Sequence, residues 1–319
     1  MKLRIRPIAC FLAIDAQPLM AARPVTYQPR RRAAFETITV RGFATRIARW
    51  GNPMLDPIVL LHGFLDTCET FQFLVDEMPA DWNFIAVDWR GFGDSASNNA
   101  PYWFPDYLAD LDALLDLLAP QQALRLVGHS MGGNVASLYA GVRPTRVSAV
   151  VSLEGFGLPP TRPEQAPARY ARWLKELREP PTRKRYDSVE QFAQLLRQRN
   201  ARLTAERAAF IALAWTRPVA GGVELRGDPW HRLINPQLYH REEAEACWRA
   251  YGGPVQIVLG DQSDHRRALG ESAQPAAFAS VFPQLEVVTV AGVGHMLHHE
   301  DPAQVASTIR PFLARHAGN

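Results

Sequence analysis

Cysteine is scarce in this sequence of 319 residues. Its three cysteines, Cys10, Cys68 and Cys247, are widely spaced and form no C-x-x-C pair. Proteins of oxidising compartments that depend on disulfides usually contain more cysteines than this sequence does, and at closer spacing. The pattern therefore suits a reducing compartment, and we expect a cytoplasmic protein, with secretion as the alternative.

Long apolar runs are also missing. No stretch of 18 or more apolar residues occurs, so we expect no membrane-spanning helix. Three basic residues precede a short apolar stretch at residues 8–14, which faintly resembles a signal peptide but stops at Asp15. Residues 1–32 hold seven Lys or Arg against one acid, and we expect a flexible basic arm, with Met20 as an alternative start.

The charge shows no strong overall bias, with a net value of +3. No motif that interleaves basic and aromatic residues is present, so we expect no nucleic-acid partner. Residues 161–250 carry seventeen Lys or Arg against eleven acids. Two interpretations stay open for that segment: a solvated helical surface, or a preference for an acidic substrate.

The rest of the chain alternates between strand-like and helix-like segments. A helix is predicted over residues 106–119, where leucines recur at helical spacing between Pro105 and Pro120. This alternation predicts an α/β fold with a mostly parallel eight-stranded sheet covered by helices on both faces. The predicted strands are residues 36–40, 44–50, 58–61, 83–87, 124–127, 147–153, 255–259 and 285–290.

The strand pattern stops between residues 157 and 251. A proline-rich stretch opens this segment, and four helix-like runs follow it, at residues 168–178, 188–199, 204–216 and 241–250. We expect a helical cap at residues 157–251 that divides the core into residues 33–156 and 252–319. Such a cap is expected to lie over the carboxyl ends of the strands, where α/β proteins bind ligands.

The most informative motif is Gly128-His129-Ser130-Met131-Gly132. It joins the apolar run before Gly128 to a helix-like run at residues 134–142, which is the context of a nucleophile elbow. In such a turn the serine hydroxyl is exposed at the tip. Small residues are needed two positions before and after it, and Gly128 and Gly132 meet that requirement.

This motif is accompanied by four further motifs. Together the five motifs resemble those of the α/β-hydrolase family, of the serine-nucleophile type with a helical cap. The resemblance covers about residues 36–319. Its motifs occur in the expected order: Leu60-Leu61-His62-Gly63-Phe64, Asp88-Trp89-Arg90-Gly91-Phe92-Gly93-Asp94-Ser95, Leu259-Gly260-Asp261-Gln262-Ser263-Asp264 and Gly292-Val293-Gly294-His295. The resemblance implies an α/β-hydrolase fold and chemistry in which Ser130 attacks a carbonyl group.

A serine nucleophile needs a base within hydrogen-bond reach, and that base needs an acid. In this fold the order along the chain is serine, acid, histidine. His295 lies in a glycine-rich loop after the last predicted strand and is the expected base. The family places the acid three or four residues after Gly260, which selects Asp264. Glu154, at the end of an earlier strand, is the alternative acid.

The oxyanion hole is expected from two backbone N–H groups, those of Met131 and Phe64. Gly63 allows the loop before Phe64 to approach the substrate. His62 and His129 are expected to be structural histidines, with His62 supporting this loop.

We expect no cofactor and no metal. Gly91, Gly93 and Ala96 fit a dinucleotide fingerprint, but a loop sequence follows them where that fingerprint requires a helix. His298 and His299 are expected to be packing or solvent residues, because no partner at ligand spacing is visible.

These features predict a serine hydrolase that cleaves a carboxylic ester of a small molecule. One alternative is a carbon–carbon bond hydrolase acting on a diketone-like acid, since the same triad and cap serve that chemistry. Another is a binding module that kept the fold without catalysis. Epoxide hydrolases and haloalkane dehalogenases of this fold use an aspartate nucleophile, and Ser130 argues against both.

Overall fold

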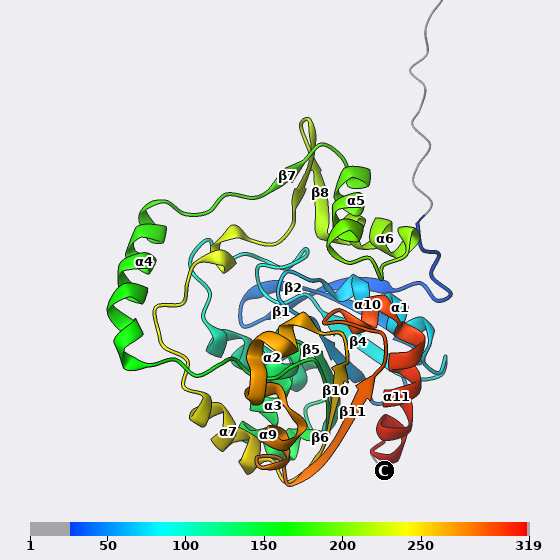
Figure 1. The fold of residues 1–319 in the computed structure, drawn as a ribbon. Helices are drawn as coiled ribbons and strands as arrows, with labels where there is room; N and C mark the ends of the chain where they lie inside the picture. The colour runs from blue at the N-terminus through cyan, green and yellow to red at the C-terminus, as the bar shows by residue number, and fades with distance from the viewer. Residues whose placement is uncertain (1–25, 318–319) are drawn as a thin grey trace, which may run out of the picture.

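The computed structural model describes residues 26–317, and its centre is an eight-stranded sheet (Figure 1). The strand order is β1-β2-β4-β3-β5-β6-β10-β11, and only the pairs β1–β2 and β2–β4 are antiparallel. The fold class predicted from the sequence is confirmed. The strands are β1 (Ala34–Val40), β2 (Phe43–Gly51), β3 (Ile58–Leu61), β4 (Asn83–Val87), β5 (Leu124–His129), β6 (Val147–Leu153), β10 (Pro254–Gly260) and β11 (Gln284–Val290).

Helices cover both faces of the sheet, as doubly buried parallel strands require. On one face of the sheet, strand residues form an apolar cluster with helices α2, α3, α7 and α9. On the other face, strand residues form a second apolar cluster with α1, α10 and α11 (Figure 1). The bounds are α1 (Gln72–Asp76), α2 (Phe104–Leu118), α3 (Met131–Val142), α7 (Arg241–Ala250), α8 (Asp264–Leu269), α9 (Pro275–Ala279), α10 (Leu297–Glu300) and α11 (Pro302–Arg315).

The segment between β6 and β10 contains both helices and strands. It holds α4 (Ala166–Arg178), α5 (Val189–Arg199) and α6 (Ala205–Trp215), and a small antiparallel sheet of order β7-β9-β8. Those strands, Arg185–Tyr186, Gly222–Leu225 and Thr216–Val219, were not expected from the sequence. The last helix of the segment, α7, packs on α3 and shares its apolar cluster with the core.

Part of the predicted N-terminal arm is docked on the core. Asp76 in α1 accepts hydrogen bonds from the Tyr27 hydroxyl at 2.9 Å and from the backbone N–H groups of Arg30 and Arg31, each at 3.0 Å. The prediction of a flexible arm is therefore wrong for residues 26–32. The short apolar stretch and Met20 lie outside the described residues. Within residues 26–317, no helix is long and apolar enough to cross a membrane.

Candidate active site

Ser130 stands at a sharp turn between β5 and α3. Its φ of +49° lies in the left-handed region, which is strained for a residue with a side chain. Its N–H donates to the Leu153 carbonyl at 2.8 Å, which ties the turn to β6. The turn has the strand–serine–helix form that the sequence predicted.

The two glycines of the turn have no room for a side chain. A Cβ on Gly128 would lie 2.3 Å from the Gly132 carbonyl oxygen, and one on Gly132 would lie 2.0 Å from the Leu61 carbonyl oxygen. Both contacts involve backbone, which cannot move aside without shifting a strand or a helix. The steric reason inferred from the sequence therefore applies at both positions.

His295 lies between Ser130 and Glu154. Its Nε2 is 3.0 Å from the Ser130 Oγ, and its Nδ1 is 3.1 Å from the Glu154 Oε2. Both separations are hydrogen-bond distances. The loop that carries His295 is anchored by Asp261, whose carboxylate accepts from the Gly292 N–H at 2.7 Å.

Glu154 is buried, with 1% of its surface exposed, and its carboxylate is fully engaged. Oε1 accepts from the Gly260 N–H at 2.6 Å, and Oε2 accepts from the Ser263 hydroxyl as well as facing His295. Several donors on a buried carboxylate hold it in a fixed orientation. The sequence did not identify Ser263 as a residue of this site.

Asp264, the acid selected from the sequence, does not reach His295. Its side chain is 94% exposed and pairs with Arg267 one turn along the same helix. The reason is local: α8 begins directly after the β10 turn, with Ser263 as its N-cap, so Ser263 faces inward and Asp264 faces solvent. The next residue, His265, lies with its ring centroid 4.5 Å from that of His295.

The loop expected to supply one oxyanion donor lies against Ser130. A Cβ on Gly63 would be 3.2 Å from the Ser130 Cβ and 2.6 Å from the His129 Nδ1, so only glycine allows this approach. The Phe64 N–H follows in this loop, and the Met131 N–H is the first of α3, where helix amides have no partner within the helix.

His62 and His129 are both buried and both bond to backbone. The His62 Nε2 accepts from the Trp89 N–H at 3.0 Å, and its Nδ1–H donates to the Gly63 carbonyl at 2.7 Å. The His129 Nε2–H donates to the His295 carbonyl at 2.9 Å. Burial lowers the pKa of each imidazole, so both are neutral supports for the loops around Ser130.

A cavity of about 160 Å³ lies between the core and the segment 157–251. Its wall is largely apolar and aromatic, with three basic side chains and a single acid among the lining residues. Ser130 and His295 do not line it; Leu65, next to Phe64, does. The lining residues include Leu65, Phe92, Tyr186, Phe192, Leu196, Trp215 and Leu225, with Lys184, Arg199, Arg232 and Asp66 as the charged members.

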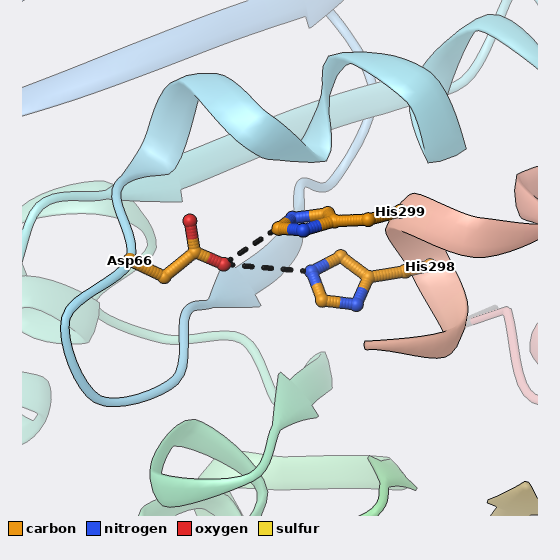
Figure 2. A group of neighbouring side chains, drawn as sticks. All are labelled: Asp66, His298 and His299. Carbon is orange, nitrogen blue, oxygen red and sulfur yellow. Dashed lines mark ion pairs between the residues drawn. The ribbon is translucent and has the colours of Figure 1, made fainter. Parts of the chain in front are cut away.

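A second polar cluster lies beneath this region and was not expected from the sequence. Asp66, His298 and His299 are all buried and converge on one another (Figure 2). Burial lowers the pKa of His298 to about 4, and the two imidazoles hold the pKa of the Asp66 carboxyl well below its usual range. Asp66 is 232 positions from His298 in the chain, which is why no ligand spacing was visible.

The Asp88–Ser95 motif forms a structural loop. The Asp88 carboxylate accepts from the backbone N–H groups of Cys68 at 2.7 Å and Asp94 at 3.1 Å. His231, from the segment 157–251, stacks on Phe92 in this loop with ring centroids 3.8 Å apart. No local sequence pattern marks His231, because its partners are far away along the chain.

A family model described as the alpha/beta hydrolase fold matches residues 56–302. The chain belongs to the α/β-hydrolase family. It is 37% identical over 145 residues, 44% of each chain, to a serine hydrolase-like protein of Danio rerio. It is 27% identical, over 94% of each chain, to the sn-1-specific diacylglycerol lipase ABHD11 of Mus musculus.

A solved structure of similar fold is the thioesterase domain from the curacin biosynthetic pathway. The TM-score is 0.78 with 26% sequence identity, over 87% of this chain and 99% of that one. Within its family, the chain is thus similar to a serine hydrolase-like protein and to two acyl hydrolases.

Proposed function

We propose that this protein hydrolyses carboxylic esters, with Ser130 as nucleophile, His295 as base and Glu154 as the acid of the triad. The observation that carries the proposal is the unbroken chain from the Ser130 Oγ through His295 to a buried, fully bonded carboxylate. The names of two similar proteins, a lipase and a thioesterase, denote acyl hydrolases and support it.

In the proposed reaction His295 removes the proton of the Ser130 hydroxyl while Oγ bonds to the ester carbonyl carbon. The imidazolium then gives that proton to the leaving alkoxide, which departs as an alcohol and leaves an acyl-enzyme. A water molecule, deprotonated by His295, attacks the acyl carbon and releases the acid and the free serine. Glu154 keeps Nδ1 protonated and stabilises the imidazolium.

The negative charge that develops on the carbonyl oxygen is assigned to the N–H groups of Phe64 and Met131. These donors come from the loop after β3 and from the first residue of α3. The dipole at the start of α3 favours the same charge. One such donor contributes about 10² to 10³ in turnover in related chemistry.

The test is hydrolysis of p-nitrophenyl esters with two to twelve acyl carbons by wild type and Ser130→Ala. We expect a marked chain-length preference in wild type and a loss of about 10⁶ in kcat in the variant. The exposed Ser280→Ala variant is the matched control and should retain activity. Equal, feeble rates for wild type and Ser130→Ala on every ester contradict the proposal and favour a binding module.

Carbon–carbon bond hydrolysis is a second candidate, favoured by the charge of the cavity. Lys184, Arg199 and Arg232 line it, and Asp66 is the one acid in its wall. A cavity with net positive charge suits a substrate that carries a carboxylate. Cleavage of a vinylogous diketo acid together with inactivity on all simple esters would select this reaction instead.

A further inference from the structure

Three buried side chains meet next to the candidate active site although the triad does not use them. Asp66 follows the loop that carries Gly63 and Phe64, and His298 and His299 lie in α10, just after His295. Their exposed fractions are 1%, 0% and 1%. Figure 2 shows both imidazole rings directed at the same carboxylate.

The separations within this cluster are those of ligands around a metal. The Asp66 Oδ2 lies 3.4 Å from the His299 Nε2 and 3.6 Å from the His298 Nε2. A charge-assisted hydrogen bond would bring such atoms to about 2.7–2.9 Å. Donors placed about 2.0–2.1 Å from a tetrahedral Zn²⁺ lie about 3.3 Å apart.

The three donor atoms that face one another are otherwise unpartnered. Within the described part of the chain, the Asp66 Oδ2 and the Nε2 atoms of His298 and His299 make no hydrogen bond. Buried polar atoms without partners are costly, and each calls for an explanation. A cation between them would satisfy all three at once.

The carboxylate is held in the orientation that a ligand needs. The other oxygen of Asp66, Oδ1, accepts from the Thr67 N–H at 2.8 Å, the Thr70 hydroxyl at 2.6 Å and the Trp215 indole N–H at 2.8 Å. Because these three hydrogen bonds all go to Oδ1, the other oxygen, Oδ2, is free to bind a metal ion as a single ligand atom. Outer contacts of this kind orient the ligands of protein metal sites.

We propose that Asp66, His298 and His299 bind one divalent transition-metal ion. Two imidazoles and a carboxylate are a donor set typical of Zn²⁺, and water is expected to complete the coordination. Of the three ligands, Asp66 lines the cavity between the core and the segment 157–251, together with Thr67 and Trp215, and we expect the ion to enter from that side.

The bound ion would stabilise the structure around the candidate active site and would take no part in the reaction itself. It joins the loop after β3, helix α10 behind His295, and, through Trp215, the end of α6. His129 lies between this site and the triad: its ring centroid is 4.3 Å from that of His298, and its Nε2 bonds the His295 backbone. The ion would therefore fix the loops on either side of Ser130.

The experiment is calorimetric titration of untagged, chelator-treated protein with Zn²⁺, followed by metal analysis after gel filtration. We expect one tightly held Zn²⁺ per chain in wild type. Asp66→Asn and His299→Gln should each weaken binding by at least about 100-fold. The control His240→Gln removes a half-exposed imidazole elsewhere and should bind like wild type.

A second measurement uses wild type alone, so it tests the proposal even if the variants do not fold. Co²⁺ added to the chelator-treated protein should give the intense visible absorption of a tetrahedral ion, and Zn²⁺ should abolish it. Absence of that absorption contradicts the proposal, as does wild type that holds no Zn²⁺. Binding that survives in folded Asp66→Asn and is lost in His295→Asn places the ion at the triad instead, which also overturns it.

Discussion

At the scale of single residues, the geometry of the candidate site depends on glycines that leave no room for a side chain and on side chains whose polar atoms are all hydrogen-bonded. Ser130 is held at a positive φ because Gly128 and Gly132 let β3, β5 and α3 come together around it. Glu154 also has a positive φ, of +58°, which turns its carboxylate from the end of β6 toward His295. Strain at such positions is maintained by the surrounding packing.

We predict that Gly132→Ala destabilises the protein by at least about 2 kcal/mol, because its Cβ would overlap the Leu61 carbonyl and force α3 away from β3. Urea denaturation measures the loss. The control is Gly252→Ala, where no atom lies within 4 Å of the added Cβ. Equal stability of the two variants would show that the turn can relax, against our account.

Much of the candidate site could be predicted from single residues, and there is a physical reason why Asp264 does not reach His295. The glycine pattern around Ser130 and the loop before His295 are local signals. The choice between Glu154 and Asp264 is not local, because it depends on which side chain faces inward after β10. The cap of α8 decides this: Ser263 turns in to Glu154, and Asp264 turns out to Arg267.

At the scale of elements, apolar runs and leucine spacing located the core strands and α2 to within a few residues. They missed β7, β8 and β9, which are two to four residues long and contain Arg185, Arg217 and Pro218. Strands this short show no recognisable alternation of apolar and polar residues. They form because they pair with one another, and the local sequence does not reveal that pairing.

The contact between the segment 157–251 and the loop after β4 gives a pH prediction. His231 is packed between Phe92 and Tyr102, with ring centroids 3.8 and 3.7 Å away, and burial lowers its pKa to about 3. Below pH 6.5 the unfolded chain protonates this imidazole and the folded protein does not. Stability should therefore fall as the pH drops from about 6.5 toward about 3.

His231→Phe keeps the stacking and removes the titrating group. Between pH 7.5 and 5.5 wild type should lose about 1.4 kcal/mol more stability than this variant. Unfolding in urea at the two pH values measures the difference. Replacement of the exposed His240 by Phe is the control, and parallel losses in wild type and His231→Phe would refute the role of His231.

At the scale of the whole molecule, the fold brings together three segments that are remote in sequence. Ser130 follows β5, Glu154 follows β6 and His295 follows β11, and the carboxyl ends of these parallel strands lie at one edge of the sheet. In the segment 157–251, α5 and α6 form a further apolar cluster with Phe73 of α1, above that edge (Figure 1). We propose that the acid of the triad comes from the end of β6 and not from the turn after β10.

The most direct test of that claim compares kcat/KM for ester hydrolysis in Glu154→Gln and Asp264→Asn, two changes that each replace a carboxylate by an amide. We predict a loss of about 10⁴ in Glu154→Gln, because the amide no longer fixes the His295 tautomer or balances the imidazolium. Asp264→Asn should match wild type, since its side chain points to solvent. A large loss in Asp264→Asn with full activity in Glu154→Gln would contradict the account.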